Sequence, residues 1–245
     1  MRVSLSLHFL LSCLIGFTIS CTNVQTKSVT TNQTDTTIVP PSAAISPVVS
    51  ITLIDSTNQM IDPRDGEIYA IVKIGNQTWM AENLRYNAVG SIINLKNPSK
   101  AYGRLYKINT AQTACLDGWH LPSDAEWDEV EMAHGMPAFF IGKSGWRGEH
   151  AANMRSVTGW KDDDGNTNSL GFNVLPAGYY TSEEMGFPNV GLEGLGFSAA
   201  FWSSIDINVG YARFMFSAKK FVNKWEDTNN DSNAGLSCRC IKNQS

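Results

Sequence analysis

The sequence is poor in the residue types that build most metal and catalytic sites. Its 245 residues include only four histidines and five cysteines. His120, His134 and His150 show no spacing typical of metal ligands, and no serine stands in the context of a nucleophile elbow. These absences argue against the common metalloenzymes and serine hydrolases.

Basic residues are also few and scattered. Nineteen Lys and Arg stand against 23 Asp and Glu, the net charge is −4 and the isoelectric point is about 5.6. There is no basic block and no Lys/Arg stripe, whereas neutralisation of phosphates dominates binding to nucleic acids. We therefore expect no nucleic-acid partner. No repeat with a period of about 20 to 50 residues is visible, which argues against solenoids and propellers.

The first 20 residues have the pattern of a secretory signal. Arg2 is the only fixed side-chain charge, an apolar run covers residues 3–17, and residues 18–20 lead directly into Cys21. The run is marginal for a membrane-spanning helix, which needs about 20 predominantly apolar residues. We therefore expect residues 1–20 to be removed.

A cysteine immediately after the cut resembles the lipobox of bacterial lipoproteins, in which its thiol is acylated. The pattern departs at Thr18, where those proteins usually have Leu. If the cut lies elsewhere, Cys21 is an ordinary free thiol. From this resemblance we expect lipidation of Cys21. Because several acyl chains anchor a protein stably, lipidation would attach the protein to the cell envelope. The outer membrane is the expected membrane, with the domain on its periplasmic side or exposed at the surface.

Residues 21–50 are predicted to form a flexible tether. They are rich in Thr, Ser, Asn and Gln, contain no aromatic residue and carry little charge. Such a segment buries too little surface to offset its ordering entropy. Removal of the signal takes away Arg2, which leaves 18 basic and 23 acidic side chains and a charge of −5. Residues 51–245 then suffice for one domain with a proper core and are short for two.

The cysteines predict one disulfide. Cys13 leaves with the signal and Cys21 goes to lipid, so Cys115, Cys238 and Cys240 remain. An oxidising compartment favours a bond from Cys115 to the C-terminal strand, worth about 4 kcal/mol in the chain-entropy model. Cys238 and Cys240 are two residues apart, hence on one face of a strand, and their spacing does not choose between them.

Local patterns predict an early hairpin and two helices. Alternating residues 68–74, the Gly75-Asn76 pair and residues 77–80 are typical of a β-hairpin. Ser123 and Glu126 form a Ser-x-x-Glu capping box for a helix that ends at Gly135. A second helix is expected over residues 149–156.

Later in the chain, short strand-like runs replace helices. They cover residues 172–175, 200–203, 212–216 and 236–241, with Gly-rich or Asn/Asp-rich loops between them. Because there is no βαβ alternation, we predict an α+β domain with a short antiparallel sheet and two main helices.

Several blocks of aromatic, glycine and polar residues stand in order between about residues 60 and 242. They are Asp65-Gly66 with Tyr69, Ile74 to Leu84, Tyr102 to Tyr106, Gly118 to Ser123 with Glu126-Trp127, Gly171 to Gly178, Phe201 to Ser204, and Arg239-Cys240. Together they resemble the Fibrobacter succinogenes major paralogous (FISUMP) domain, common in surface proteins of Bacteroidetes and Fibrobacteres. That family is defined by its pattern and not by an established activity.

The resemblance implies a disulfide pairing and a fold. The family usually pairs the cysteine before the Gly-Trp-His-Leu-Pro block with the terminal Arg-Cys, which here implies Cys115 with Cys240 and a free Cys238. The Leu-Pro-Ser helix start and the Trp-Ser-Ser block look like those of C-type-lectin-like and formylglycine-generating-enzyme-like folds. A C-type-lectin-like domain is thus implied, although a fold does not fix a function.

One acidic loop is a candidate calcium site. Ca²⁺ takes about 6 to 8 oxygen ligands, and residues 161–168 place oxygen side chains at alternate positions around a glycine. A second oxygen-rich loop covers residues 226–231. The competing interpretation is an ordinary exposed turn, since the glutamate of a full EF-hand is missing. The candidate ligands are Asp162, Asp164, Asn166 and Asn168, and no cofactor is expected to be required.

Three tryptophans are candidate ligand platforms. Trp146, Trp160 and Trp225 stand beside polar or glycine-rich loops, where an exposed ring would stack on a sugar or a peptide. The competing interpretation is burial in the core, the more frequent place for an aromatic side chain.

These observations lead to one functional expectation and two alternatives. We expect a non-enzymatic, envelope-anchored lipoprotein whose domain is a binding or adhesion module, with glycans as a candidate ligand. The first alternative is a structural or assembly subunit that binds envelope proteins. The second is an enzyme of the formylglycine-generating type that uses Cys238. The cysteine spacing differs from that of those enzymes, and Cys240 is expected in the disulfide.

Overall fold

The computed structural model describes residues 58–162, 165–181, 191–204, 210–217, 219–227 and 233–244. The chain divides into two units, residues 1–45 and 46–245, and the described residues all belong to the second. The predicted signal, Cys21 and the tether lie outside the described residues. Among the helices of the described ranges, none is both long and apolar enough to cross a membrane.

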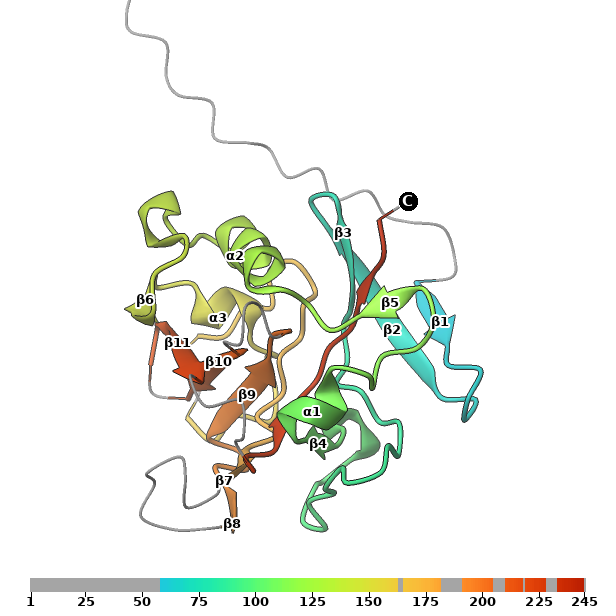
Figure 1. The fold of residues 1–245 in the computed structure, drawn as a ribbon. Coiled ribbons are helices and arrows are strands. Elements are labelled where there is room, and N and C mark those ends of the chain that lie inside the picture. The colour runs from blue at the N-terminus through green and yellow to red at the C-terminus, as the bar shows by residue number, and fades with distance from the viewer. Residues whose placement is uncertain are drawn as a thin grey trace, which may run out of the picture. The chain divides into compact units, whose positions relative to one another are not determined.

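A five-stranded antiparallel sheet joins the beginning and the end of the domain (Figure 1). Its order is β1-β2-β3-β13-β5. The predicted hairpin is present, because β2 pairs with β3 around Gly75, whose φ of 59° suits the tight turn. The C-terminal strand β13 lies between β3 and β5, with Ile241 opposite both Trp79 and His120. The strands are β1 (Gln59–Ile61), β2 (Ile68–Ile74), β3 (Gln77–Met80), β5 (Trp119–His120) and β13 (Ile241–Lys242).

A six-stranded sheet carries the later strands in the order β4-β12-β9-β10-β11-β6. All its pairs are antiparallel except β12 with β9. A separate pair, β7 (Tyr179–Thr181) and β8 (Gly191–Glu193), forms a small third sheet. The six strands are β4 (Leu105–Tyr106), β6 (Gly145–Arg147), β9 (Ser198–Trp202), β10 (Gly210–Phe216), β11 (Val222–Asp227) and β12 (Leu236–Ser237).

Helix α2 (Asp124–Ala133) is the one long helix of the described residues. Its predicted capping box is confirmed: Ser123 Oγ accepts from the Glu126 amide at 3.2 Å, and the Glu126 carboxylate accepts from the Ser123 amide at 2.8 Å. The remaining helices are short: α1 (Ile108–Ala111), α3 (Ala151–Met154), and the 3₁₀ turns η1 (Lys100–Tyr102) and η2 (Ala138–Phe140).

Three local predictions need correction. The second main helix shrinks to α3, because Arg155 adopts an extended conformation and bridges to Val174. Residues 172–175 contribute only Val174 to this isolated bridge and do not form the predicted strand. The predicted strand 236–241 is two strands, β12 and β13, in different sheets. The domain is therefore α+β in the sense of a sheet-rich fold with few helical residues.

The core consists of two clusters of buried hydrophobic side chains. One lies around Tyr69, Tyr106 and Trp202, and the other around Trp79 and Trp127. In the second, the rings of Trp79 and Trp127 are 5.1 Å apart, and Phe172 meets both edge-on. Tryptophans of the motif blocks thus pack the interior, as offset and edge-to-face aromatic pairs do in other cores.

The Cys115–Cys240 disulfide is present, with a Cα–Cα distance of 5.8 Å across 125 residues of sequence. The pairing implied by the family resemblance is confirmed. Cys238 is free and buried. It lies with Cys240 in the short connection between β12 and β13, where the chain passes from one sheet to the other.

Candidate functional site

A balanced network of charges is buried between helix α2 and three neighbouring strands. Asp124, Asp128 and Glu131 are spaced by four and three residues, which places their side chains on one face of α2. The opposing cations are Arg147, Arg213 and Lys224, from β6, β10 and β11. Because these strands are adjacent in the order β10-β11-β6, the sheet presents its three cations to the three carboxylates.

The contacts within this network are short. Glu131 Oε1 accepts from Arg213 Nε at 2.8 Å and from Arg147 Nη2 at 2.6 Å, while His150 Nε2 lies 3.0 Å from Glu131 Oε2. Arg147 Nη1 is 2.8 Å from Asp128. These five side chains are almost entirely inaccessible to solvent, so each charge depends on its partners rather than on water.

Two acids of the network, Glu131 and Asp124, are held ionised. Burial alone would raise the pKa of Glu131, but the hydrogen bond from His150 and the charges of Arg213 and Arg147 outweigh it and lower the pKa to about 2. Asp124 shows the same balance, with Arg213 and Lys224 lowering its pKa against burial. A carboxylate held ionised by compensating cations is a poor proton donor. The ion pairs of the network join α2 to strands β6, β10 and β11.

A shallow groove of about 450 Å³ opens beside this network. Trp146 precedes Arg147 in β6 and is 47 % exposed, and Phe221 is 38 % exposed. The Trp146 ring rests against Phe216, with ring centroids 5.8 Å apart. The lining residues are His134, Gly135, Pro137, Phe140, Trp146, Gly148, Glu149, Asn153 and Phe221.

The polar groups of the groove carry little charge. Burial lowers the pKa of His134 to about 4, so its ring is neutral, and Nδ1 donates to the Val130 carbonyl at 2.7 Å. The Asn153 amide donates to the His134 carbonyl at 2.8 Å and accepts from Thr167 at 3.1 Å. Among the described lining residues, Glu149 is therefore the one with a formal charge, and its side chain is exposed.

The three predicted tryptophan platforms have different environments. Trp146 is in the groove. Trp160 is buried at 8 % exposure, its Nε1 donates to the Val174 carbonyl at 3.1 Å, and Arg155 covers its ring. The expected exposure of Trp160 is corrected, because its ring belongs to a core cluster. Trp225 is partly buried and packs edge-on against Phe214.

The predicted calcium loop is only partly described, because Asp164 lies outside the described residues. Asp162 accepts a hydrogen bond from Ser217 at 2.9 Å. Asn168 accepts from the backbone amide of Asn173 at 2.7 Å, which closes the turn after the loop. Asn166 is partly buried. In the described ranges, no three His, Cys, Asp or Glu side chains gather as a metal site would require.

Sequence reasoning missed the charged network and most of the groove. The spacing of Asp124, Asp128 and Glu131 was a usable signal, since three acids on one helical face are either solvated or paired. The sequence contains no comparable signal for the cations, because Arg147, Arg213 and Lys224 are in three different strands. Phe140 and Phe221 are likewise brought to Trp146 only by the fold.

Comparison with known proteins gives one finding. Residues 72–242 match the model of the family described as the Fibrobacter succinogenes major domain. No match was found among curated proteins or among solved structures. The matched residues include α2, the groove and both cysteines of the disulfide.

Proposed function

The chain belongs to the Fibrobacter succinogenes major domain family, and from this premise we propose that it is a non-enzymatic, envelope-anchored binding module for neutral glycans. The observation that carries the proposal is the exposed Trp146 ring above a groove that also presents Phe221 and Glu149.

The chemistry of the groove matches that of a sugar. A pyranose ring offers an apolar C–H face and several hydroxyl donors, and aromatic rings with one carboxylate acceptor complement both. Trp146 and Phe221 supply the apolar contact, and Glu149 supplies the acceptor. The volume of about 450 Å³ is within the range of roughly 300–1,000 Å³ for small-molecule sites. Since no lysine or arginine is among the described residues that line the groove, a neutral glycan fits better than an acidic one.

The groove is supported by rigid parts of the fold, which favours a preformed binding site. Arg147 holds β6 to α2 through Glu131 and Asp128. The loop before β6 is attached as well, because Asp128 Oδ2 accepts from the Gly142 amide at 2.8 Å. A preformed site loses less entropy on binding than a flexible one.

The test is a glycan array probed with the full chain and two variants. Trp146→Ala should lose binding. Phe197→Ala, which removes a ring of similar exposure (43 %) outside the groove, should bind like the parent. Equal thermal melting of the variants ensures that folding is not the cause. An array without signal, or full binding by Trp146→Ala, would contradict the proposal.

The lipid anchor is part of the same proposal. It is supported by the signal pattern of residues 1–20 and by Cys21 immediately after it. Intact mass of the protein purified from native membranes tests it. A mass that includes acyl chains on residue 21 supports the anchor, and an unmodified mass rejects it.

We also propose that the fold is a variant of the C-type-lectin-like fold. The two blocks that suggested it are neighbours: the Ser204 amide donates to the Pro122 carbonyl at 2.7 Å, and Trp127 Nε1 donates to the Trp202 carbonyl at 3.3 Å. An experimental structure superposed on a C-type lectin domain would decide this point.

One alternative function keeps a specific observation in its favour. Phe139 and Ile141 are exposed by 64 % and 49 % in and just after η2, next to the groove. Such a patch suits the interface of an assembly subunit, and co-purification of a defined envelope protein would favour it. The formylglycine-generating alternative has no such support, because Cys238 is fully buried and burial raises the pKa of its thiol.

The proposal requires no cofactor. Calcium at Asp162, Asp164, Asn166 and Asn168 stays a prediction that thermal melting with Ca²⁺ and with a chelator tests. A melting temperature raised by Ca²⁺ and lowered by chelator supports it. Identical curves identify the loop as an ordinary solvated turn.

A further inference from the structure

A second surface differs from the rest of this acidic protein. Between Glu82 and Asp117 the sequence contains no acidic residue, although the chain as a whole has a net charge of −4. The same segment contains five cations, Arg85, Lys96, Lys100, Arg104 and Lys107. The segment is therefore a local concentration of positive charge.

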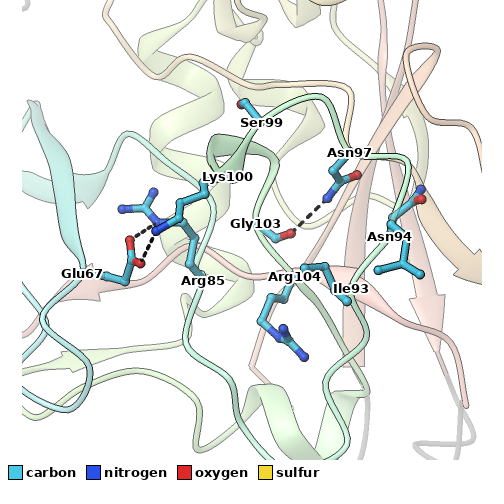
Figure 2. Close-up of a pocket in the computed structure, with 10 residues that line it drawn as sticks. Glu67, Arg85, Ile93, Asn94, Asn97, Ser99, Lys100, Gly103 and Arg104 are labelled. Atoms are coloured by element: carbon cyan, nitrogen blue, oxygen red, sulfur yellow. Dashed lines mark hydrogen bonds and ion pairs between the residues drawn. The ribbon is translucent and has the colours of Figure 1, made fainter.

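A cleft of about 380 Å³ opens within this segment. Figure 2 shows Lys100 and Arg85 pointing toward Glu67, while Arg104 and Ile93 lie away from that carboxylate. Lys100 is 3.0 Å and Arg85 is 2.9 Å from Glu67. Arg85 also pairs with Glu82 at 3.2 Å, and Arg104, which lines the same cleft, pairs with neither carboxylate. Three cations thus stand against two carboxylates, and the cleft keeps an excess of positive charge.

The cations that remain have no carboxylate partner in the described part of the chain. Arg104 donates to the side chain and the carbonyl of Ser91, at 2.8 and 3.2 Å. Lys96 makes no ion pair within the described residues. An anion at the cleft would therefore gain a new partner instead of displacing an existing one.

The apolar side chains of the segment are placed at the tips of turns. The Ser91 amide bonds the Ala88 carbonyl at 3.0 Å, so Val89 lies in the corner of one turn, and Gly90 has a φ of 82°. The Asn97 amide bonds the Asn94 carbonyl at 2.9 Å, so Leu95 and Lys96 lie in the corner of another. Polar and small residues normally occupy such positions. Here Val89 is 96 % and Leu95 is 90 % exposed.

Leu95 and Ile93 line the same cleft as Lys100 and Arg104. Projecting aliphatic side chains beside uncompensated cations are the combination by which a protein surface enters the interface of an anionic bilayer. A protein partner would more often meet exposed Trp or Tyr anchors. No tryptophan occurs between residues 83 and 116, and Tyr102 and Tyr106 are buried. Tyr86 is partly buried, packs against a core cluster and has the Arg64 guanidinium over its ring.

We propose that the cleft and its apolar turn, centred on Leu95, Lys96 and Arg104, form a docking surface for an anionic lipid membrane. The aliphatic side chains enter the acyl boundary, and the cations meet the phosphates of the headgroups. This contact is separate from the lipid anchor and from the glycan groove. It would orient the domain on the membrane to which the anchor attaches it.

The test is co-sedimentation with vesicles of the full chain carrying Cys21→Ser, which cannot be acylated at that position. Vesicles of phosphatidylcholine are compared with vesicles that also contain phosphatidylglycerol. Because every variant keeps the same N-terminal residues, differences between variants report on the domain. Leu95→Asp and Lys96→Glu should each weaken binding to the anionic vesicles by about tenfold or more.

Two matched controls come from another exposed part of the domain. Ile141→Asp introduces the same charge at an aliphatic residue that is 49 % exposed, and Lys143→Glu reverses an exposed lysine nearby. Both should bind like the parent. Lys96 is an exposed turn residue, so its variant keeps the test valid even if Leu95→Asp folds poorly.

Three outcomes of the direct binding comparison would overturn the proposal. They are unchanged binding by Lys96→Glu, loss of binding by the Ile141 or Lys143 variants, and equal binding to neutral and anionic vesicles. Complete competition by inorganic phosphate at constant ionic strength would also reject a lipid surface and indicate a site for free anions. The vesicle measurements do not depend on the result of the glycan array, so the two proposals are tested separately.

Discussion

Glu131 and Arg213 are 82 residues apart in sequence and meet at 2.8 Å, both without exposure to solvent. Their contact joins helix α2 to strand β10 through the interior of the domain. Removing one partner of such a pair leaves the other charge buried and uncompensated. Substitutions at this contact are therefore expected to cause large losses in the free energy of unfolding.

We expect Glu131→Gln to lower the free energy of unfolding by about 3–5 kcal/mol, because Arg147 and Arg213 lose their shared carboxylate. The control is Glu129→Gln on the exposed side of the same helix, which should cost about 1 kcal/mol or less. Urea unfolding of the parent and both variants measures this. Equal losses in the two variants would show that the network does not brace the fold.

Stability should decline as the solution becomes acidic. The pKa of Glu131 is lowered from 4.5 to about 2 in the folded protein, so its contribution is present above pH 4.5 and is lost as the pH falls toward 2. The pKa of His134 is lowered from 6.5 to about 4. As the pH falls, His134 in the unfolded chain therefore binds a proton before His134 in the folded protein does. The free energy of unfolding for this reason also falls as the pH is lowered from 6.5 to 4.

Urea titrations at a series of pH values measure this decline. Glu131→Gln should flatten the curve below pH 4.5, whereas a decline between pH 6.5 and 4.5, to which His134 contributes, should persist. A variant with the same slope as the parent below pH 4.5 would assign the acid sensitivity to other groups.

The cysteines should respond unequally to substitution. Cys115→Ser and Cys240→Ser should each cost about 4 kcal/mol, because the disulfide closes a loop that spans most of the domain. Cys238→Ala removes a buried thiol outside the bond and should cost about 1 kcal/mol, the effect of a small cavity. Mass spectrometry without reduction should still find one disulfide in Cys238→Ala. Loss of the bond in that variant would contradict the pairing.

Ligand affinity should depend on both the aromatic ring of Trp146 and the carboxylate of Glu149. For a glycan identified on the array, Trp146→Ala should raise the Kd by about tenfold or more, the effect of losing one aromatic contact. Glu149→Gln should also raise the Kd, since the amide is a weaker hydrogen-bond acceptor than the carboxylate. Calorimetry measures both. A Kd unchanged by Glu149→Gln would remove that residue from the site.

Local sequence signals predicted several elements well. The Gly75-Asn76 turn and the Ser123–Glu126 capping box act within a few residues, and both are present as expected. The second helix was overpredicted, because the bridge from Arg155 to Val174 overrides the local preference. The strand over residues 236–241 was predicted as one unit, although its two halves join sheets that the local pattern does not distinguish.

The candidate sites were less accessible from sequence. Trp146 was identified as a platform, but Trp160 has the same kind of neighbours in sequence and is buried. The acid-free segment between Glu82 and Asp117 was visible in the sequence and was missed, because its cations are spread out rather than clustered. The exposure of Leu95 at the tip of a turn beside these cations, which suggests a membrane contact, is known only from the structure.

The sequence by itself determined the family, the hairpin, the capped helix and the presence of a disulfide, because these depend on short motifs and on the number of cysteines. The tertiary structure decided which charges are paired and which aromatics are exposed. Arg147, Arg213 and Lys224 meet the carboxylates of α2 only because β10, β11 and β6 are neighbours. Such long-range pairing is set by the packing of the whole domain, which no short segment encodes.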